Sequence, residues 1–292
     1  MPPWATFFDT WRVDPVAAGV VAVTLVGWLL AVLRLRRSGT GWPVRASLGL
    51  LVALGGYAAI SFGFLGVESR DLRWAFTTRI ALLLLVVPSL ALLGRPLELA
   101  TRALPPGPSA ALGRIIGSWP ARLLGNALVA PVVACAVFVV FLTPVGGAWR
   151  TSGVAEGTSD VLAPLVGLLF VIGIAAHGDL RSDVFLAAEF GFSFLELVLD
   201  AIPGLVLRLT DHVLDGVGAV VGPRPVWWPS PLSDQHWSGD FLWVIAEVSD
   251  VPILIALFVR WARTDARRAR VADELSEAEH EDLVRAHLRR DL

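Results

Sequence analysis

Hydrophobic residues in this chain of 292 residues come in blocks of about 20, and polar or charged stretches separate the blocks. An α-helix of about 20 apolar residues is long enough to cross the hydrocarbon core of a bilayer. Seven blocks predict seven membrane spans, at about 15–35, 46–66, 75–97, 123–142, 161–177, 183–209 and 239–261. We therefore expect an all-α, polytopic membrane protein with a transmembrane domain over residues 1–262 and a charged, helical, cytoplasmic tail over residues 263–292.

The distribution of arginine predicts how these spans are oriented. All 24 basic residues are arginine. When the connections between spans are assigned alternately to the two sides, seventeen arginines fall on one side and seven on the other. The side richer in cations is normally cytoplasmic. This rule predicts an external amino terminus and a cytoplasmic carboxyl terminus, as an odd number of spans requires.

The sixth hydrophobic block carries acidic residues that an ordinary apolar span would lack. Glu189, Glu196 and Asp200 are seven and four residues apart, which places them on one face of a helix. An acid at bilayer depth costs about 2.5–3.5 kcal/mol on insertion scales, so it normally faces the interior of a bundle or a wet cavity. Two interpretations stay open: these carboxylates pair with Arg79 to fix helix packing, or they bind a metal, relay protons or line a cation path.

The seventh block has a second acidic pair, Glu247 and Asp250, on one helix face. Before it, the polar segment Asp234 to Trp237, which includes His236, follows a stretch rich in proline and tryptophan. We interpret this segment as part of a rigid external loop at the membrane surface. Glu156 falls in the polar link before the fifth span, and we expect it to be solvated.

Two further local features concern packing. Pro88 lies at mid-depth in the third span, where proline frees a backbone carbonyl that a neighbouring helix must satisfy. The connection from 95 to 122 has apolar residues at helical spacing, which predicts a short amphipathic helix in the cytoplasmic interface.

Several classes of function find no support in the sequence. The chain has neither a G-x4-G-K-[ST] motif nor a G-x-S-x-G motif, and no H-x3-H or C-x2-C pair that would suggest a metal cage. Cys135 is the only cysteine, so no intrachain disulfide is possible. The basic clusters flank predicted spans and are explained by topology, which argues against nucleic-acid binding. We do not expect an enzyme.

Three segments resemble the CtaG-type cytochrome c oxidase assembly proteins. The stretch from Pro88 to Leu97 looks like that family's V-A-P-x-L-L-x-L-G-x-P run, and Gly167 to Phe170 matches a second, shorter stretch. The block from Asp234 to Glu247, with the following W-x-x-x-D-x-R-x-A-R tail from Trp261, is similar to the family's D-Q-x-x-G-G-x-x-x-W-x-x-G-E pattern. The resemblance extends over roughly residues 10–275.

This resemblance implies a seven-span protein of the bacterial plasma membrane that helps cytochrome c oxidase to mature, with oxidase subunits as partners and copper as the metal delivered. Phe76 and Ile80 stand where the family usually shows the histidines of H-M-x-x-H, and neither side chain binds copper. We look for the shared function in the Asp234 to Trp237 segment and in Glu247 and Asp250. Two alternatives remain: a small-solute or cation transporter that uses the intramembrane carboxylates, and a structural membrane protein that interacts with the oxidase.

Overall fold

The computed structural model describes residues 2–126, 129–176, 201–217 and 225–249, together with positions 199, 258, 262 and 266. Across these residues the regular secondary structure is entirely helical, as predicted. Four of the helical segments are long and apolar enough to cross a membrane: Pro15–Arg37, Val44–Glu68, Arg73–Leu93 and Gly153–Ile172. A fifth arises if the pair Val132–Val140 and Pro144–Thr151, which is bent by 79°, counts as one span. The multi-span architecture is thus confirmed, whereas the count of seven and the orientation remain predictions.

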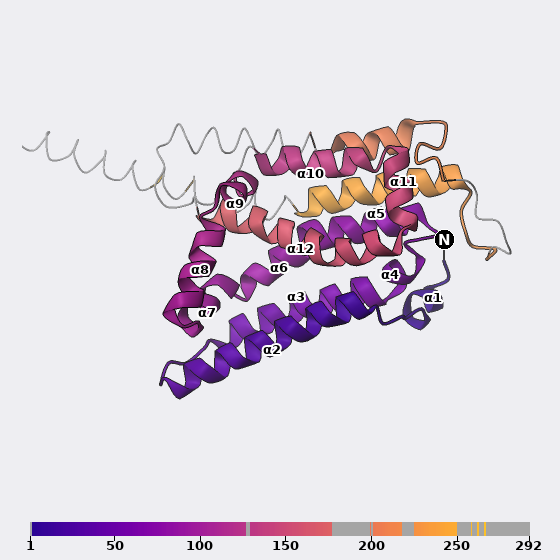
Figure 1. Cartoon of the computed structure of the whole chain (residues 1–292). Helices are drawn as coiled ribbons and strands as arrows, with labels where there is room; N and C mark the ends of the chain where they lie inside the picture. The colour runs from indigo at the N-terminus through magenta and orange to yellow at the C-terminus, as the bar shows by residue number, and fades with distance from the viewer. Residues whose placement is uncertain are drawn as a thin grey trace, which may run out of the picture.

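The first half of the chain forms two long helices and a third, composite one (Figure 1). A short helix α1 precedes them. The bounds are α1 Trp4–Asp9, α2 Pro15–Arg37, α3 Val44–Phe62, α4 Phe64–Glu68, α5 Arg73–Ala81, the π-helix η1 Leu82–Val86, and α6 Val87–Leu93.

The second half of the described chain contains a group of short helices, one long helix and two further helical stretches. The bounds are α7 Pro96–Ala103, α8 Pro106–Ile116, α9 Trp119–Leu124, α10 Val129–Val140, α11 Pro144–Thr151 and α12 Gly153–Ala176, followed by helical residues 201–209 and 231–249. The connection 95–122 therefore holds three helices instead of the one we predicted. The rest of the predicted sixth and seventh spans and the tail lie outside the described residues.

Figure 1 separates the bundle into two ends. We call one the α1 end: α1, α4 and α11 lie there, and α2, α5 and α12 begin there. We call the other the α7 end, where α7, α8 and α9 lie and α2 finishes in Arg34, Arg36 and Arg37. Because these arginines follow the first span, the positive-inside rule predicts that the α7 end is cytoplasmic and the α1 end external.

The start of α2 shows how the sequence sets a helix boundary. The Asp14 side chain accepts hydrogen bonds from the amides of Val16 and Ala17, both at 2.9 Å, and Pro15 occupies the first helical position. An aspartate cap satisfies amides that have no partner inside the helix. Proline is tolerated at the first helical position because an N–H there would have no partner in the helix, so its absence costs nothing. The helix therefore starts at the predicted residue.

The helix of the third span is irregular around Pro88. Pro88 cannot donate to the carbonyl of Leu84, four residues earlier, and the chain forms the π-helix η1 just before it. Gly167 of α12 lies directly against that carbonyl, so close that any side chain at position 167 would collide with it. The freed carbonyl thus lies against a neighbouring helix, and position 167 of that helix must be glycine. That this helix also satisfies the carbonyl remains a prediction.

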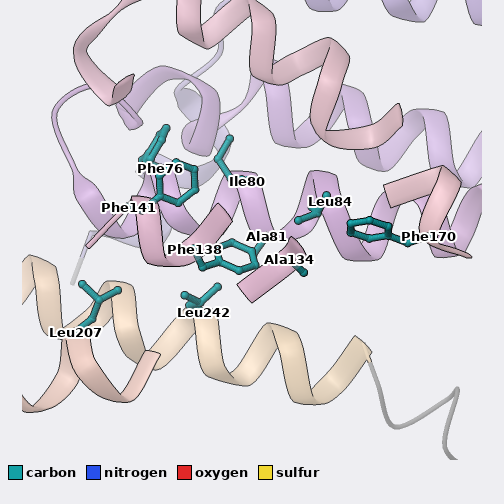
Figure 2. Packing of buried hydrophobic residues seen from close by; sticks show 10 residues of the cluster. All are labelled: Phe76, Ile80, Ala81, Leu84, Ala134, Phe138, Phe141, Phe170, Leu207 and Leu242. Atoms are coloured by element: carbon teal, nitrogen blue, oxygen red, sulfur yellow. The ribbon is translucent and has the colours of Figure 1, made fainter. Parts of the chain in front are cut away.

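The largest buried apolar cluster joins α5, η1, α10 and α12 to the helical stretches 201–209 and 231–249. Figure 2 shows its members: Phe76, Ile80, Ala81, Leu84, Ala134, Phe138, Phe141, Phe170, Leu207 and Leu242. The rings of Phe76 and Phe141 meet edge to face, with centroids 4.9 Å apart. We call this set the aromatic core. It connects segments that lie between Phe76 and Leu242 in the sequence.

Candidate functional site

A buried pair of opposite charges lies at the α1 end, between α5 and α12. Nη2 of Arg79 donates to Oδ1 of Asp160 at 2.6 Å. The two residues are 1% and 0% exposed. Helix α3 joins them, because the Ser61 hydroxyl donates to Oδ1 of Asp160 at 3.2 Å and the Tyr57 hydroxyl donates to the Asp160 carbonyl at 3.0 Å. Three long helices are therefore tied together by polar contacts around one aspartate.

Glu156, one turn earlier on α12, gathers three arginines from different parts of the chain. Its carboxylate accepts from Arg70 at 2.7 Å, from Arg12 at 3.2 Å and from Arg79 at 3.5 Å. Our prediction that Glu156 is solvated was wrong, since the residue is only 6% exposed. The reason is that α12 begins eight residues before the predicted span, so its first two turns lie beside α2 and α3, within reach of the Arg79 side chain. We call Arg12, Arg70, Arg79, Glu156 and Asp160 the arginine network.

The Asp234 segment forms the next part of the site. We predicted a loop here, and that prediction was wrong: the segment lies in the first two turns of the helix 231–249. The Ser230 hydroxyl caps the start of this helix by accepting from Ser233 N at 3.2 Å. The Asp234 carboxylate accepts from the amides of Arg73 and Trp74, at 2.8 and 2.9 Å. Those amides open α5 and have no partner within it. One helix thus caps the start of another, 160 residues away in sequence.

Gln235 and Ser238 extend this contact. The Gln235 oxygen accepts from Nη1 of Arg73 at 2.6 Å and from the Leu214 amide at 2.9 Å, while its nitrogen donates to the His212 carbonyl at 2.9 Å. The hydroxyls of Ser238 and Thr77 are 2.6 Å apart. Both Gln235 and Ser238 are fully buried. The segment therefore holds the start of α5 and the connection 210–217 in fixed positions.

A second buried ion pair completes the α1 end. Nη2 of Arg150, on α11, donates to Asp215 at 3.1 Å, and Nη1 of the same residue donates to the Arg70 carbonyl at 2.6 Å. Arg73 in turn donates to the Phe141 carbonyl at 2.8 Å. Hydrogen bonds thus run from the arginine network through α11 to the Asp234 segment.

The remaining predicted site residues do not join this group. His236 is half-buried, with Nε2 3.1 Å from the Thr210 carbonyl. Glu247 is half-buried and lies about 20 Å along the same helix from Asp234, by the rise of 1.5 Å per residue. Within the described part of the chain it makes no ion pair. Four predicted residues lie outside the described residues: Glu189, Glu196, Asp200 and Asp250.

The described residues do not fit a copper centre. They contain no group of three or more His, Cys, Asp or Glu side chains that could hold a metal ion. Phe76 and Ile80, at the positions of the expected histidines, belong to the aromatic core (Figure 2). Copper(I) prefers thiolate, thioether and imidazole ligands, and each carboxylate of the arginine network already has a guanidinium partner. This part of the molecule is suited to holding helices and surface segments together.

Sequence reasoning missed most of this network although a signal was present. Glu156 and Asp160 are four residues apart, so they share a helix face, and both precede an apolar segment on the side of the membrane predicted for Arg79. An acidic pair and an arginine at the same predicted depth favour an ion pair. The roles of Gln235 and Ser238 had no such signal, because the partner of a neutral polar side chain cannot be inferred from its charge.

These features define a multi-pass helical membrane protein whose external end, in the predicted orientation, is cross-linked by buried arginines. Residues 26–264 match the family model described as cytochrome c oxidase caa3 assembly factor (Caa3_CtaG). The chain belongs to this family, as the resemblance predicted. The matched range includes every member of the arginine network except Arg12.

Mycobacterial relatives resemble the chain over nearly its whole length. An uncharacterized protein of Mycobacterium bovis is 26% identical over 294 residues, and one of Mycobacterium leprae is 27% identical over 298 residues. Each alignment covers 96% of this chain but 44% of the relative. The chain therefore spans less than half the length of these relatives. No solved structure matches it.

Proposed function

We propose that this protein is a non-enzymatic assembly factor of the plasma membrane that assists maturation of the catalytic subunit of cytochrome c oxidase. Membership of the caa3 assembly-factor family supports the oxidase as partner. The observation that carries the proposal lies in the most specific part of the family-like sequence. There the side chains of Asp234, Gln235 and Ser238 all contact α5 and fix the α1 end.

Direct copper ligation is not part of the proposal. The positions of the family histidines are apolar here, and the described residues offer no cluster of metal ligands. We propose that the protein acts by contact with the oxidase subunit, holding it in a state that accepts its cofactors. Copper, in this account, is cargo that other proteins supply.

We further propose that the α1 end is the face that contacts the oxidase. Large apolar side chains on and beside α1 are exposed there, notably Trp4, Phe8 and Trp11. Arg12 and Arg70 flank them and are half-exposed, even though both are paired with Glu156. An interface with exposed aromatic residues and arginine beside them has the composition that protein-protein contacts favour.

The test is the content of active cytochrome c oxidase in membranes from a deletion strain, grown with and without added copper. The account predicts that the deletion strain loses assembled oxidase. Added copper should not restore the oxidase, whereas expression of the wild-type chain should. Full restoration by copper alone would favour copper delivery instead. An unchanged content of active oxidase in the deletion strain would contradict the proposed function.

A further inference from the structure

Helix α2 packs closely against its neighbours along only part of its length, and two adjoining apolar cavities lie beside it. One, of about 540 Å³, lies between α2, α3, α6 and α12, and the other, of about 470 Å³, lies mainly between α2 and α7. Val23, Thr24, Leu50 and Pro96 line both cavities. The two cavities thus form one trough beside α2.

The second cavity has the length of one membrane leaflet. Along α2 it extends from Val23 to Arg34, which corresponds to about 16 Å at 1.5 Å per residue, or about half the hydrocarbon thickness of a bilayer. Its floor is formed by Leu99, Ala100 and Ala103 of α7. A single leaflet is the depth that the acyl chains of one phospholipid occupy.

The chemistry changes at the end of this cavity. Arg34 is its only charged lining residue, and it makes no ion pair with any described residue. Helix α7, on the opposite wall, carries Arg95 and Arg102, which share the single carboxylate of Glu98. The walls are apolar in the membrane and cationic at its surface, which is complementary to an acyl chain joined to an anionic headgroup.

We propose that this cavity binds an anionic phospholipid of the leaflet at the α7 end, with an acyl chain between α2 and α7 and the headgroup phosphate on Arg34. A lipid is favoured over a helix from a partner protein because the apolar walls lead to Arg34, a cation that complements a headgroup phosphate. The site is independent of the proposed role in oxidase maturation.

Gly27 offers a way to test the acyl-chain part of the site. It lines the cavity, and a Cβ added to it would meet no atom within 4 Å. Gly27→Phe should fill the cavity without changing any charge. Gly19 is equally open but lines only the other cavity, so Gly19→Phe is the matched control.

The experiment is native mass spectrometry of the purified full chain, equilibrated with equal amounts of phosphatidylglycerol and phosphatidylcholine. We expect the wild type to retain phosphatidylglycerol about tenfold better, as one charge-assisted phosphate contact suggests. Arg34→Ala should abolish this preference, whereas Arg37→Ala, which removes an exposed arginine outside the cavity, should preserve it. Gly27→Phe should reduce retention of both lipids, and Gly19→Phe should not.

The melting temperature of each variant in detergent identifies any that fails to fold, and Arg34→Gln then replaces Arg34→Ala. Equal retention of the two lipids by the wild type would overturn the proposal, as would a loss of preference in Arg37→Ala. Thermal protection by glycerol phosphate alone, without an acyl chain, would also overturn it, because the site would then be one for free phosphate compounds.

Discussion

Helix α5 borders two regions of opposite character. Its Arg73, Thr77 and Arg79 enter the polar contacts of the α1 end, while Phe76 and Ile80 enter the aromatic core (Figure 2). In the first region nearly every buried polar side chain has a specific partner from a distant segment. In the second, apolar side chains pack without directional contacts. The first region fixes geometry, and the second provides a general interior.

The difference supports our proposal that the α1 end is the functional face. The segment that most resembles the family retains its polar side chains and uses them at the α1 end. Phe76 and Ile80, where the resemblance led us to expect histidines, belong to an apolar interior. A surface held in place by buried ion pairs is suited to recognition, whereas an aromatic interior is suited to stability alone.

Removal of Arg79 should have the largest effect on stability. Arg79→Ala leaves Asp160 and Glu156 buried with less cationic compensation, and breaking a buried pair in this way typically costs about 3–5 kcal/mol. The melting temperature in detergent and the folded fraction by size-exclusion chromatography measure the loss. Arg37→Ala, at an exposed arginine, is the control. Equal stability of the two variants would mean that the arginine network does not hold the α1 end.

Removal of a ring from the aromatic core should cost less. In soluble cores Phe→Ala costs about 3–5 kcal/mol, but in a membrane the alternative environment is lipid, so only packing is lost. Phe138→Ala should therefore lower the melting temperature less than Arg79→Ala and leave oxidase content nearly unchanged. A larger loss of oxidase for Phe138→Ala than for Arg79→Ala, at matched protein level, would reverse the comparison.

Loss of the cap on α5 should have a moderate effect. Asp234→Ala removes the acceptor for the Arg73 and Trp74 amides, and loss of a helix cap costs about 0.5–2 kcal/mol. Asp234→Asn keeps an acceptor and should retain much of this stability. The two variants are compared by melting temperature and by oxidase content. If both variants match the wild type in both measurements, the trans cap has no role.

Glu247 should contribute least to stability. It is half-buried and lies far from the arginine network, so Glu247→Ala should change the free energy of unfolding by about 0.5 kcal/mol or less. Our sequence-based prediction is that it nevertheless impairs oxidase maturation. Glu98→Ala, which removes another half-buried carboxylate at the α7 end, is the control. Wild-type oxidase content in Glu247→Ala would remove this residue from the site.

The sequence predicted the fold better than the site, for a physical reason. Blocks of apolar residues give helix positions directly, and Asp14 and Pro15 mark the start of α2 to the residue. The partners in the site depend on which helices lie side by side, which no local pattern encodes. Arg79 was thus matched to the acids of the sixth span, whereas Asp160 and Glu156 of α12 are its described partners. Asp234 looked like a loop residue because the apolar pattern starts only after it.

The most direct test of the account is site-specific photo-cross-linking in living cells. A photoreactive amino acid replaces Trp11 at the α1 end or Trp119 at the α7 end, two exposed tryptophans of similar character. The account predicts cross-links to the catalytic subunit of cytochrome c oxidase from position 11 and none from position 119. Cross-links to that subunit from position 119 alone, or from neither position, would contradict the claim that the α1 end is the functional face.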